Sequence, residues 1–300
     1  MLSSIITRAR PTATIAKLAG GVFVAGFAAK YTMGMAHAES PQPPSPPPNK
    51  VFGRAGPALV SLVLEDAEMV NHNTRRLRFR FEDKEAVSGL PLTSALLTYA
   101  WPKGSWTPVL RPYTPITPAD ETGHLDLLVK QYPDGKSSTH LHGLQPGQTL
   151  FFVAPLAGHR WQANSYKHVT LIAGGAGITP IYQLARGILD NPADKTAVTV
   201  VFGVNSDRDV LFQKEFDAYQ ARFPGRFRAV YTVSEPVEDS PHRKGRVTRE
   251  LLEEVAPRPG PENMVFVSGP PGMETALVGS RTEKGMLEKY GYSKAQIYKF

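Results

Sequence analysis

The period of the hydrophobic pattern changes near Lys167, and this change constrains the fold more than any other feature of the chain. Before it, apolar and polar residues alternate, as in residues 76–81, where Leu77, Phe79 and Phe81 share one face. Such alternation is typical of half-buried antiparallel strands. After it, buried-type strands alternate with helical patterns, which is typical of a parallel sheet. The sequence therefore predicts two domains of different architecture.

The first folded domain is expected to span residues 51–165. Strand patterns recur there without an intervening helical pattern, and Pro/Gly turns separate them, which predicts a small antiparallel β-barrel. The expected strands cover residues 58–64, 76–81, 96–101, 125–132 and 149–153. His140 and His142, expected on a strand, are interpreted as structural, because no acid cluster or third histidine is near them in the sequence. No metal site is predicted.

The second folded domain is expected to span residues 166–300 as a doubly wound α/β domain with a parallel sheet. Thr179 has the side chain of a helix N-cap, and Pro180 suits the first helical position. Sheets of this kind bind ligands beyond the carboxyl ends of their strands. The expected strands are 168–173, 197–204, 227–233, 264–268 and 296–300, and the expected helices are 180–189, 210–223, 248–255 and 273–290.

The charge and the cysteine content exclude several classes of protein. The net charge is +7, but the first 50 residues carry five basic residues and one acid, so the folded body is only mildly positive. A nucleic-acid-binding protein should carry its positive charge in the folded part, so that class is disfavoured. The chain has no cysteine, which excludes disulfides, cysteine-ligated iron–sulfur clusters and thiolate zinc sites.

Residues 1–39 are predicted to hold a targeting segment and a membrane anchor. The first 17 residues contain three basic residues and no acid, as in a mitochondrial presequence or the positive flank of an anchor. Residues 18–36 would form a helix of about 28 Å, just enough to cross a bilayer. A cleaved leader that releases a soluble form is the alternative. Residues 40–50 include six prolines and predict an extended linker.

Residues 111–115 read Arg-Pro-Tyr-Thr-Pro and present three different chemical groups at fixed angles. A guanidinium suits a pyrophosphate, an aromatic face suits a flat ring, and a hydroxyl can hydrogen-bond a heteroatom of that ring. Residues 135–138 add a small-residue turn whose backbone N–H groups suit an anion. The two segments favour a pocket for a flavin dinucleotide. A β-edge turn with an exposed arginine is the alternative.

Two glycine loops follow strands of the expected parallel sheet, at residues 174–177 and 269–272. The first is a weak dinucleotide signal, because Pro180 stands where the third glycine of the usual fingerprint would be. A plain β–α connection is the alternative. Asp209 is predicted to hydrogen-bond an adenosine ribose and so to favour NADH over NADPH. A simple acid at a helix N-terminus competes with that interpretation.

The combined motifs resemble the NADH-cytochrome b5 reductases of the ferredoxin reductase-like flavoprotein superfamily, most closely the mitochondrial fungal branch. The resemblance covers residues 51–300 and implies that NADH gives a hydride to FAD, which passes single electrons to a haem protein, cytochrome b5. It also implies a monomer at the mitochondrial outer membrane, with a soluble intermembrane-space form. The motifs are Arg111–Pro115, Gly135–Ser138, Gly174–Pro180, Gly269–Met273 and Tyr298–Phe300.

The resemblance also implies roles for single residues. Arg111 would bind the FAD phosphates, Tyr113 and Thr114 the isoalloxazine, and Thr179 would lie between flavin and nicotinamide. The candidate catalytic residues are Thr114, Thr179 and Ser268. The candidate cofactor-binding residues are Arg111, Pro112, Tyr113, Thr114, Lys130, Tyr132, Gly135, Lys136, Ser137, Ser138, Gly174, Gly175, Gly177, Thr179, Pro180, Asp209, Gly269, Pro270, Met273 and Phe300.

Two positions depart from the family pattern. The family usually has Cys directly before the Gly-Pro-Pro loop, where this chain has Ser268, and often Met where it has Ser137. The first change alters a side chain expected at the nicotinamide. Two alternative functions therefore stay open at this point: a tethered flavin-binding scaffold without turnover, and an NADH reductase for a different acceptor.

Overall fold

The computed structural model describes residues 47–53 and 59–300. The expected targeting segment, the anchor helix and most of the proline-rich linker lie outside these residues. In the part of the chain that is described, no helix has both the length and the apolar character needed to cross a membrane.

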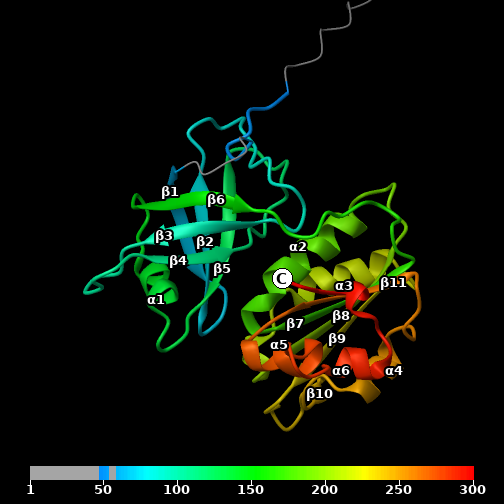
Figure 1. Ribbon diagram of the computed structural model, residues 1–300. Coiled ribbons are helices and arrows are strands. Elements are labelled where there is room, and N and C mark those ends of the chain that lie inside the picture. The colour runs from blue at the N-terminus through cyan, green and yellow to red at the C-terminus, as the bar shows by residue number, and fades with distance from the viewer. Residues whose placement is uncertain (1–46, 54–58) are drawn as a thin grey trace, which may run out of the picture. The chain divides into compact units, whose positions relative to one another are not determined.

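The first sheet is antiparallel and has six strands in the order β4-β3-β6-β1-β2-β5 (Figure 1). A bridge between Pro115 and Leu127 joins the segment after β4 to β5, so the sheet closes on itself. The antiparallel architecture predicted for the first half is confirmed. The strands are β1 (Val60–Met69), β2 (Thr74–Arg80), β3 (Ala95–Ala100), β4 (Val109–Tyr113), β5 (His124–Lys130) and β6 (Thr149–Leu156).

Alternation along β2 builds the core of this sheet. Leu77 and Phe79 are fully buried, whereas Arg78 points the other way and donates to both carboxylate oxygens of Asp126 at 2.8 and 2.9 Å. The ring of Phe79 packs edge-on against Phe152 at 5.5 Å between centroids. Burial of each such large apolar side chain stabilises the fold by about 1.5–3 kcal/mol.

A helix that the sequence did not predict, α1 (Lys136–Gly143), lies between β5 and β6. The strand expected for His140 and His142 is therefore wrong. On a helix, residues two apart do not share a face, and the His142 ring nitrogen Nε2 donates to the Val129 carbonyl at 2.8 Å. Among the described residues, no cluster of three or more His, Cys, Asp or Glu side chains suits a metal ion.

The second sheet is parallel, as predicted, with the order β10-β9-β8-β7-β11-β12. The chain builds outward from β7 to β9 and then returns to the other side of β7, so β7 and β11 flank a topological switch point. Ligands bind at such points in open parallel sheets. The strands are β7 (His168–Gly174), β8 (Ala197–Val204), β9 (Phe227–Val233), β10 (Arg243–Lys244), β11 (Asn263–Ser268) and β12 (Ile297–Lys299).

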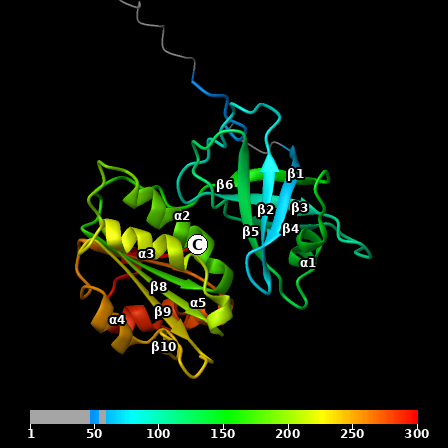
Figure 2. The ribbon, with the colours of Figure 1, turned by 180° about the vertical axis from the view of Figure 1, so that it is seen from behind.

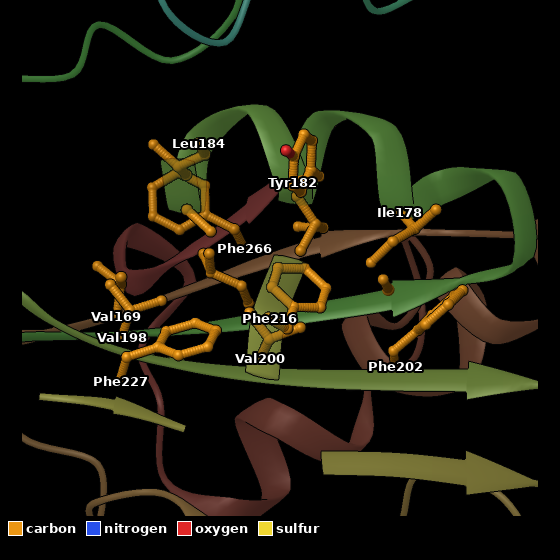
Figure 3. Close-up of a cluster of buried hydrophobic side chains, with 14 of the residues drawn as sticks. Val169, Ile178, Tyr182, Leu184, Val198, Val200, Phe202, Phe216, Phe227 and Phe266 are labelled. Carbon is orange, nitrogen blue, oxygen red and sulfur yellow. The ribbon is translucent and has the colours of Figure 1, made fainter. Parts of the chain in front are cut away.

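Helices cover both faces of the parallel sheet (Figures 1 and 2). On one face lie α2 (Ile178–Leu189) and α3 (Gln213–Arg222). On the other lie α4 (Arg249–Val255), α5 (Pro271–Val278) and α6 (Met286–Tyr290). Short 3-10 turns are η1 (Gly175–Gly177), η2 (Asp207–Asp209) and η3 (Lys294–Gln296). Figure 3 shows part of the core under α2 and α3, including Val169, Ile178, Tyr182, Leu184, Val198, Val200, Phe202, Phe216, Phe227 and Phe266.

Three predicted helices differ from the observed ones. Helix α2 begins at Ile178, so the Thr179 side chain does not cap it and instead donates to the Ala176 carbonyl at 3.3 Å. Helix α3 begins at Gln213, after η2. The helix expected over 273–290 is split, because the backbone crosses itself at Gly279 and Gly285, where a Cβ on either residue would clash with the backbone of the other.

Candidate functional site

A cleft of about 980 Å³ lies between the antiparallel sheet and the parallel sheet. Most of the predicted site residues line it: Arg111, Pro112, Tyr113, Thr114, Lys130, Tyr132, Gly135, Lys136, Ser137, Ser138, Gly177, Thr179, Pro180, Ser268 and Phe300. Other predicted residues lie outside the cleft lining: Gly174, Gly175, Asp209, Gly269, Pro270 and Met273.

Strand β4 and the residue after it supply one wall of the cleft. Pro112 has no N–H to give to a ladder, which suits the end strand of the sheet order. Arg111 is exposed and its Nη1 donates to the Leu110 carbonyl at 2.8 Å. Tyr113 is half-buried, and its hydroxyl shares a 3.1 Å hydrogen bond with Ser137 Oγ. Burial raises the pKa of Tyr113 despite this bond, so the phenol is neutral at physiological pH.

The N-terminus of α1 supplies the second part of this wall. Gly135 is its N-cap, no side chain caps this end, and the first turn carries no acid. Side chains crowd the cap, since a Cβ on Gly135 would clash with Ser138 Oγ. Free N–H groups at a helix N-terminus attract anions. The predicted anion nest at residues 135–138 is thus the first turn of a helix.

The facing wall comes from the carboxyl ends of β7 and β11. Gly177 packs directly on the backbone of Ser268, because a Cβ at position 177 would clash with the Ser268 carbonyl. A Cβ on Gly174 would likewise meet the Met273 sulfur and Pro270. These glycines let the two loops touch, and Thr179 and Ser268, both 8% exposed, line the cleft on this side.

Asp209 is buried in an ionic cluster rather than open to the cleft. Its Oδ1 accepts hydrogen bonds from Lys130 Nζ at 2.7 Å and Asn73 Nδ2 at 3.1 Å, and its Oδ2 accepts one from Ser206 Oγ at 2.8 Å. Burial works to raise the pKa of Asp209, but these hydrogen bonds outweigh it and lower the pKa to about 2. The carboxylate joins the two sheets, and its role in nucleotide selection stays a prediction.

Sequence reasoning missed several lining residues, of which Thr93 is the most unusual. Its φ is 71°, a left-handed backbone that a β-branched residue rarely adopts. Its hydroxyl donates to the His159 carbonyl at 2.6 Å, and a Cβ on Gly158 would clash with the Thr93 carbonyl. Nothing in the sequence around Thr93 indicates that it contacts residues 158 and 159. The other missed lining residues include Ala95, Pro108, Val109, Leu110, Leu128, Asp134, Leu156, Ala157, Gly158, Ala176 and Tyr298.

The donors in the cleft fit a flavin dinucleotide. One wall combines a guanidinium, an ammonium and an uncapped helix N-terminus, which are groups that bind a pyrophosphate. Next to them stand a neutral phenol and the Thr114 hydroxyl, which suit a flat heterocycle. On the facing wall, Gly177 lets a second planar group approach the backbone.

Comparisons with known proteins also assign the two halves of the chain to two different domains. Residues 61–161 match the family model of the oxidoreductase FAD-binding domain, and residues 171–278 match that of the oxidoreductase NAD-binding domain. The cytochrome b5 reductase domain of Ulva prolifera nitrate reductase has a similar structure, with a TM-score of 0.73 and 27% identity. That likeness covers 81% of this chain and 97% of the other.

Two fungal proteins named NADH-cytochrome b5 reductase 2 are similar over most of their length. The one from Emericella nidulans is 49% identical over 280 residues, which cover 90% of this chain and 85% of the relative. The one from Pyricularia oryzae is 49% identical over 249 residues, which cover 80% and 75%. With both domain models matched in order and a cleft built for two planar ligands, the chain belongs to the NADH-cytochrome b5 reductase family.

Proposed function

We propose that this protein is an NADH-cytochrome b5 reductase, which uses bound FAD to pass electrons from NADH to cytochrome b5. The observation that carries the proposal is the cleft, where the Arg-Pro-Tyr-Thr strand and the α1 N-terminus face the carboxyl ends of β7 and β11. When bound, FAD supplies the redox chemistry, since it accepts a hydride from NADH and releases electrons singly.

The antiparallel wall binds and orients the flavin dinucleotide. Arg111 and Lys136 neutralise its phosphates, and the free N–H groups at the start of α1 complete that anion site. Tyr113 is held by Ser137 and presents its neutral ring and hydroxyl to the cofactor. Thr114 donates or accepts a hydrogen bond at the heterocycle, and Pro112 fixes the backbone that carries all three groups.

The parallel wall positions the nicotinamide. Thr179, in the first turn of α2, and Ser268, the last residue of β11, both line the cleft, and Gly177 packs against the Ser268 backbone. Hydride transfer needs its reacting atoms within about 3–3.5 Å, so these two residues would have to hold the nicotinamide at that distance from the flavin. Phe300 lines the same cleft and excludes water from it.

A spectroscopic titration tests the proposed function. The purified full chain should show the absorbance of bound FAD, lose it on addition of NADH under nitrogen, and regain it when oxidised cytochrome b5 is added. NADPH should act much more slowly. A chain that stays colourless when FAD is supplied refutes the cofactor assignment. A coloured chain that NADH does not bleach is a flavin scaffold, and one that bleaches without reducing cytochrome b5 serves another acceptor.

We also propose that residues 18–36 anchor the protein in the mitochondrial outer membrane and that residues 40–50 act as a spacer, with a soluble intermembrane-space form. What supports this is the largely apolar stretch of residues 18–36, whose one charged residue is Lys30, after a basic, acid-free N-terminus. A monomer is expected, because one chain supplies both walls of the cleft. Carbonate extraction of mitochondria, with a chain lacking residues 18–36 as the control, tests the anchor. Analytical ultracentrifugation of a chain lacking residues 1–39 tests the monomer.

A further inference from the structure

Helix α2 carries a buried glutamine where it contacts the antiparallel domain. Gln183 is 6% exposed, and its Nε2 donates to the carbonyls of Ser94 and Pro115, each at 3.4 Å. Ser94 precedes β3 and Pro115 follows β4, so the two acceptors come from separate segments of that domain. One amide therefore connects a helix of the second domain to two segments of the first.

The stability of the helix does not explain this amide. Leu184 and Ala185, the next residues of α2, are fully buried and apolar, and Figure 3 shows Leu184 in the core under the helix. Among the described residues, no donor reaches the Gln183 Oε1 atom. A buried acceptor that is left unpaired destabilises the folded chain. An apolar side chain of similar size would avoid this cost, so the amide points to a role other than stability.

Both acceptors of the amide are next to residues of the antiparallel wall of the cleft. Pro115 directly follows Thr114, which lines the cleft. Ser94 directly follows Thr93, which lines it as well. Gln183 is not part of the cleft lining. Any influence of Gln183 on a ligand in the cleft is therefore indirect.

The parallel-wall residue that Gln183 can influence is Thr179, in the first turn of α2. Gln183 follows it by four positions, so the two lie on one face of the helix, about 6 Å apart along its axis. Arg186 extends this face and donates to the Ile116 carbonyl of the antiparallel domain. Because a helix is a rigid element, two contacts along one face fix its position along its axis and its rotation about it. These contacts set where the Thr179 hydroxyl stands relative to the antiparallel wall.

We propose that Gln183 is a positioning residue for hydride transfer, which acts through Thr179 and holds it at a fixed distance from Thr114. This inference rests on the proposed function and deepens it, because it names a residue that sets the approach of the nicotinamide to the flavin. The hydride, one proton with two electrons, passes from NADH to FAD and leaves NAD⁺ and reduced FAD. That transfer needs its reacting atoms within about 3–3.5 Å, so a small shift of α2 slows it.

Gln183→Met in the full chain loaded with FAD tests the proposal. Methionine has a similar volume and no amide, so the FAD content and the midpoint of urea unfolding should stay close to those of the wild type. The limiting rate of flavin reduction at saturating NADH, measured by stopped-flow absorbance, should fall about 10–100-fold. The NADH concentration that gives half of this rate should stay close to the wild-type value, because Gln183 does not line the cleft.

Gln220→Met is the matched control. Gln220 is also a helix glutamine with an amide bonded to the backbone, since its Oε1 accepts from the Ala229 N–H at 3.2 Å. Both of these residues belong to the parallel domain, on α3 and β9. The control thus loses a hydrogen bond of the same kind, but within one domain, and its limiting rate should equal that of the wild type.

Two further readouts separate positioning from a general defect. Thr179→Ala should slow flavin reduction, and Gln183→Met should slow that variant less than it slows the wild type, because the residue through which it acts has lost its hydroxyl. The second readout needs no turnover. When NAD⁺ is added to the reduced protein, stacking of the two rings gives a long-wavelength charge-transfer absorbance, which should be weaker in Gln183→Met at saturating NAD⁺.

An unchanged limiting rate or an unchanged charge-transfer absorbance in Gln183→Met would overturn the inference. Equal slowing of the wild type and of Thr179→Ala, or equal slowing by Gln220→Met, would do the same. If Gln183→Met does not bind FAD, Arg186→Met removes the second contact of the same helix face and should slow flavin reduction, and an unchanged rate there would also overturn the inference. A wild-type chain that binds FAD but is not reduced by NADH overturns the proposed function instead.

Discussion

The two walls of the cleft offer different things to a ligand. The antiparallel wall presents side chains, with Arg111, Tyr113 and Lys136 among them. The parallel wall is built around backbone, because Gly174, Gly177 and Gly269 let the β7 and β11 loops touch. Substitutions that remove a side chain should therefore impair the antiparallel wall, whereas substitutions that add a side chain should impair the parallel wall.

The largest effect is expected from adding atoms to the parallel wall. Gly177→Val should lower the free energy of unfolding by about 2–3 kcal/mol, because its side chain must displace the Ser268 backbone. Displacement of the Ser268 backbone should also slow flavin reduction by NADH about 100-fold. Gly272→Ala is the matched control, since open space surrounds Gly272. Thermal melts and stopped-flow absorbance measure both effects, and equal behaviour of the two variants would refute the contrast.

Removal of a side chain from the antiparallel wall should have the next largest effect. Arg111→Ala deletes a charge-assisted contact to a phosphate, worth about 1.5–3 kcal/mol, so the Kd for FAD should rise about 10–100-fold. Fluorescence titration of the apoprotein with FAD gives the Kd. Arg228→Ala, at an exposed arginine of β9 outside the cleft, should leave it unchanged. A weakened FAD affinity in both variants would indicate a general charge effect.

The Lys130–Asp209 ion pair crosses between the walls and limits their independence. Because the pKa of Asp209 is about 2 in the folded chain, below its ordinary value of 3.8, its bonds stabilise the fold above pH 4 and are lost as pH falls toward 2. Lys130→Met should therefore lower the free energy of unfolding at pH 7 by about 1–2 kcal/mol.

Urea denaturation at several pH values measures this loss for Lys130→Met. The gap in unfolding free energy between wild type and variant should narrow as pH falls from about 4 toward 2, where Asp209 gains a proton first in the unfolded chain and then in the folded wild type. A gap that is constant down to pH 3 would show that Lys130 acts through packing and not through the carboxylate.

The smallest effect concerns the one side chain of the parallel wall that departs from the family pattern. Ser268→Cys should raise the rate of flavin reduction by NADH a few-fold, since a small gain in alignment at this position acts on the reacting distance. Stopped-flow kinetics at saturating NADH measures the rate. An unchanged or slower step would remove Ser268 from the mechanism and leave Thr179 as the positioning hydroxyl.

The strands were predictable because their burial follows local alternation. Residues 76–81 alternate as the sequence indicated, and β7 is buried along its whole length, as a continuous apolar run predicts. Helix α1 was not predictable, because its first turn of Lys and Ser carries no apolar stripe and its C-terminal carbonyls are bound by a residue far away in sequence. Arg75 donates to the carbonyls of His142 and Leu144.

The site was predictable where its residues form short motifs and not where the fold joins distant ones. Arg111 and its neighbours line the cleft as a contiguous segment. The bond between Lys130 and Asp209 joins residues 79 positions apart, so the sequence could not show that this carboxylate is buried against Lys130. Thr93 could not be predicted as a lining residue, because its left-handed backbone accompanies a close contact with Gly158, which is far away in the sequence.

Helix α2 connects the parallel wall of the cleft to the antiparallel sheet. Thr179 is in its first turn, and further along the helix Gln183 donates to the carbonyls of Ser94 and Pro115, each at 3.4 Å. Arg186 donates to the Ile116 carbonyl, in the segment that follows the Arg-Pro-Tyr-Thr strand. A tilt of one sheet against the other would thus strain these hydrogen bonds, which hold the Thr179 hydroxyl in place relative to the antiparallel wall.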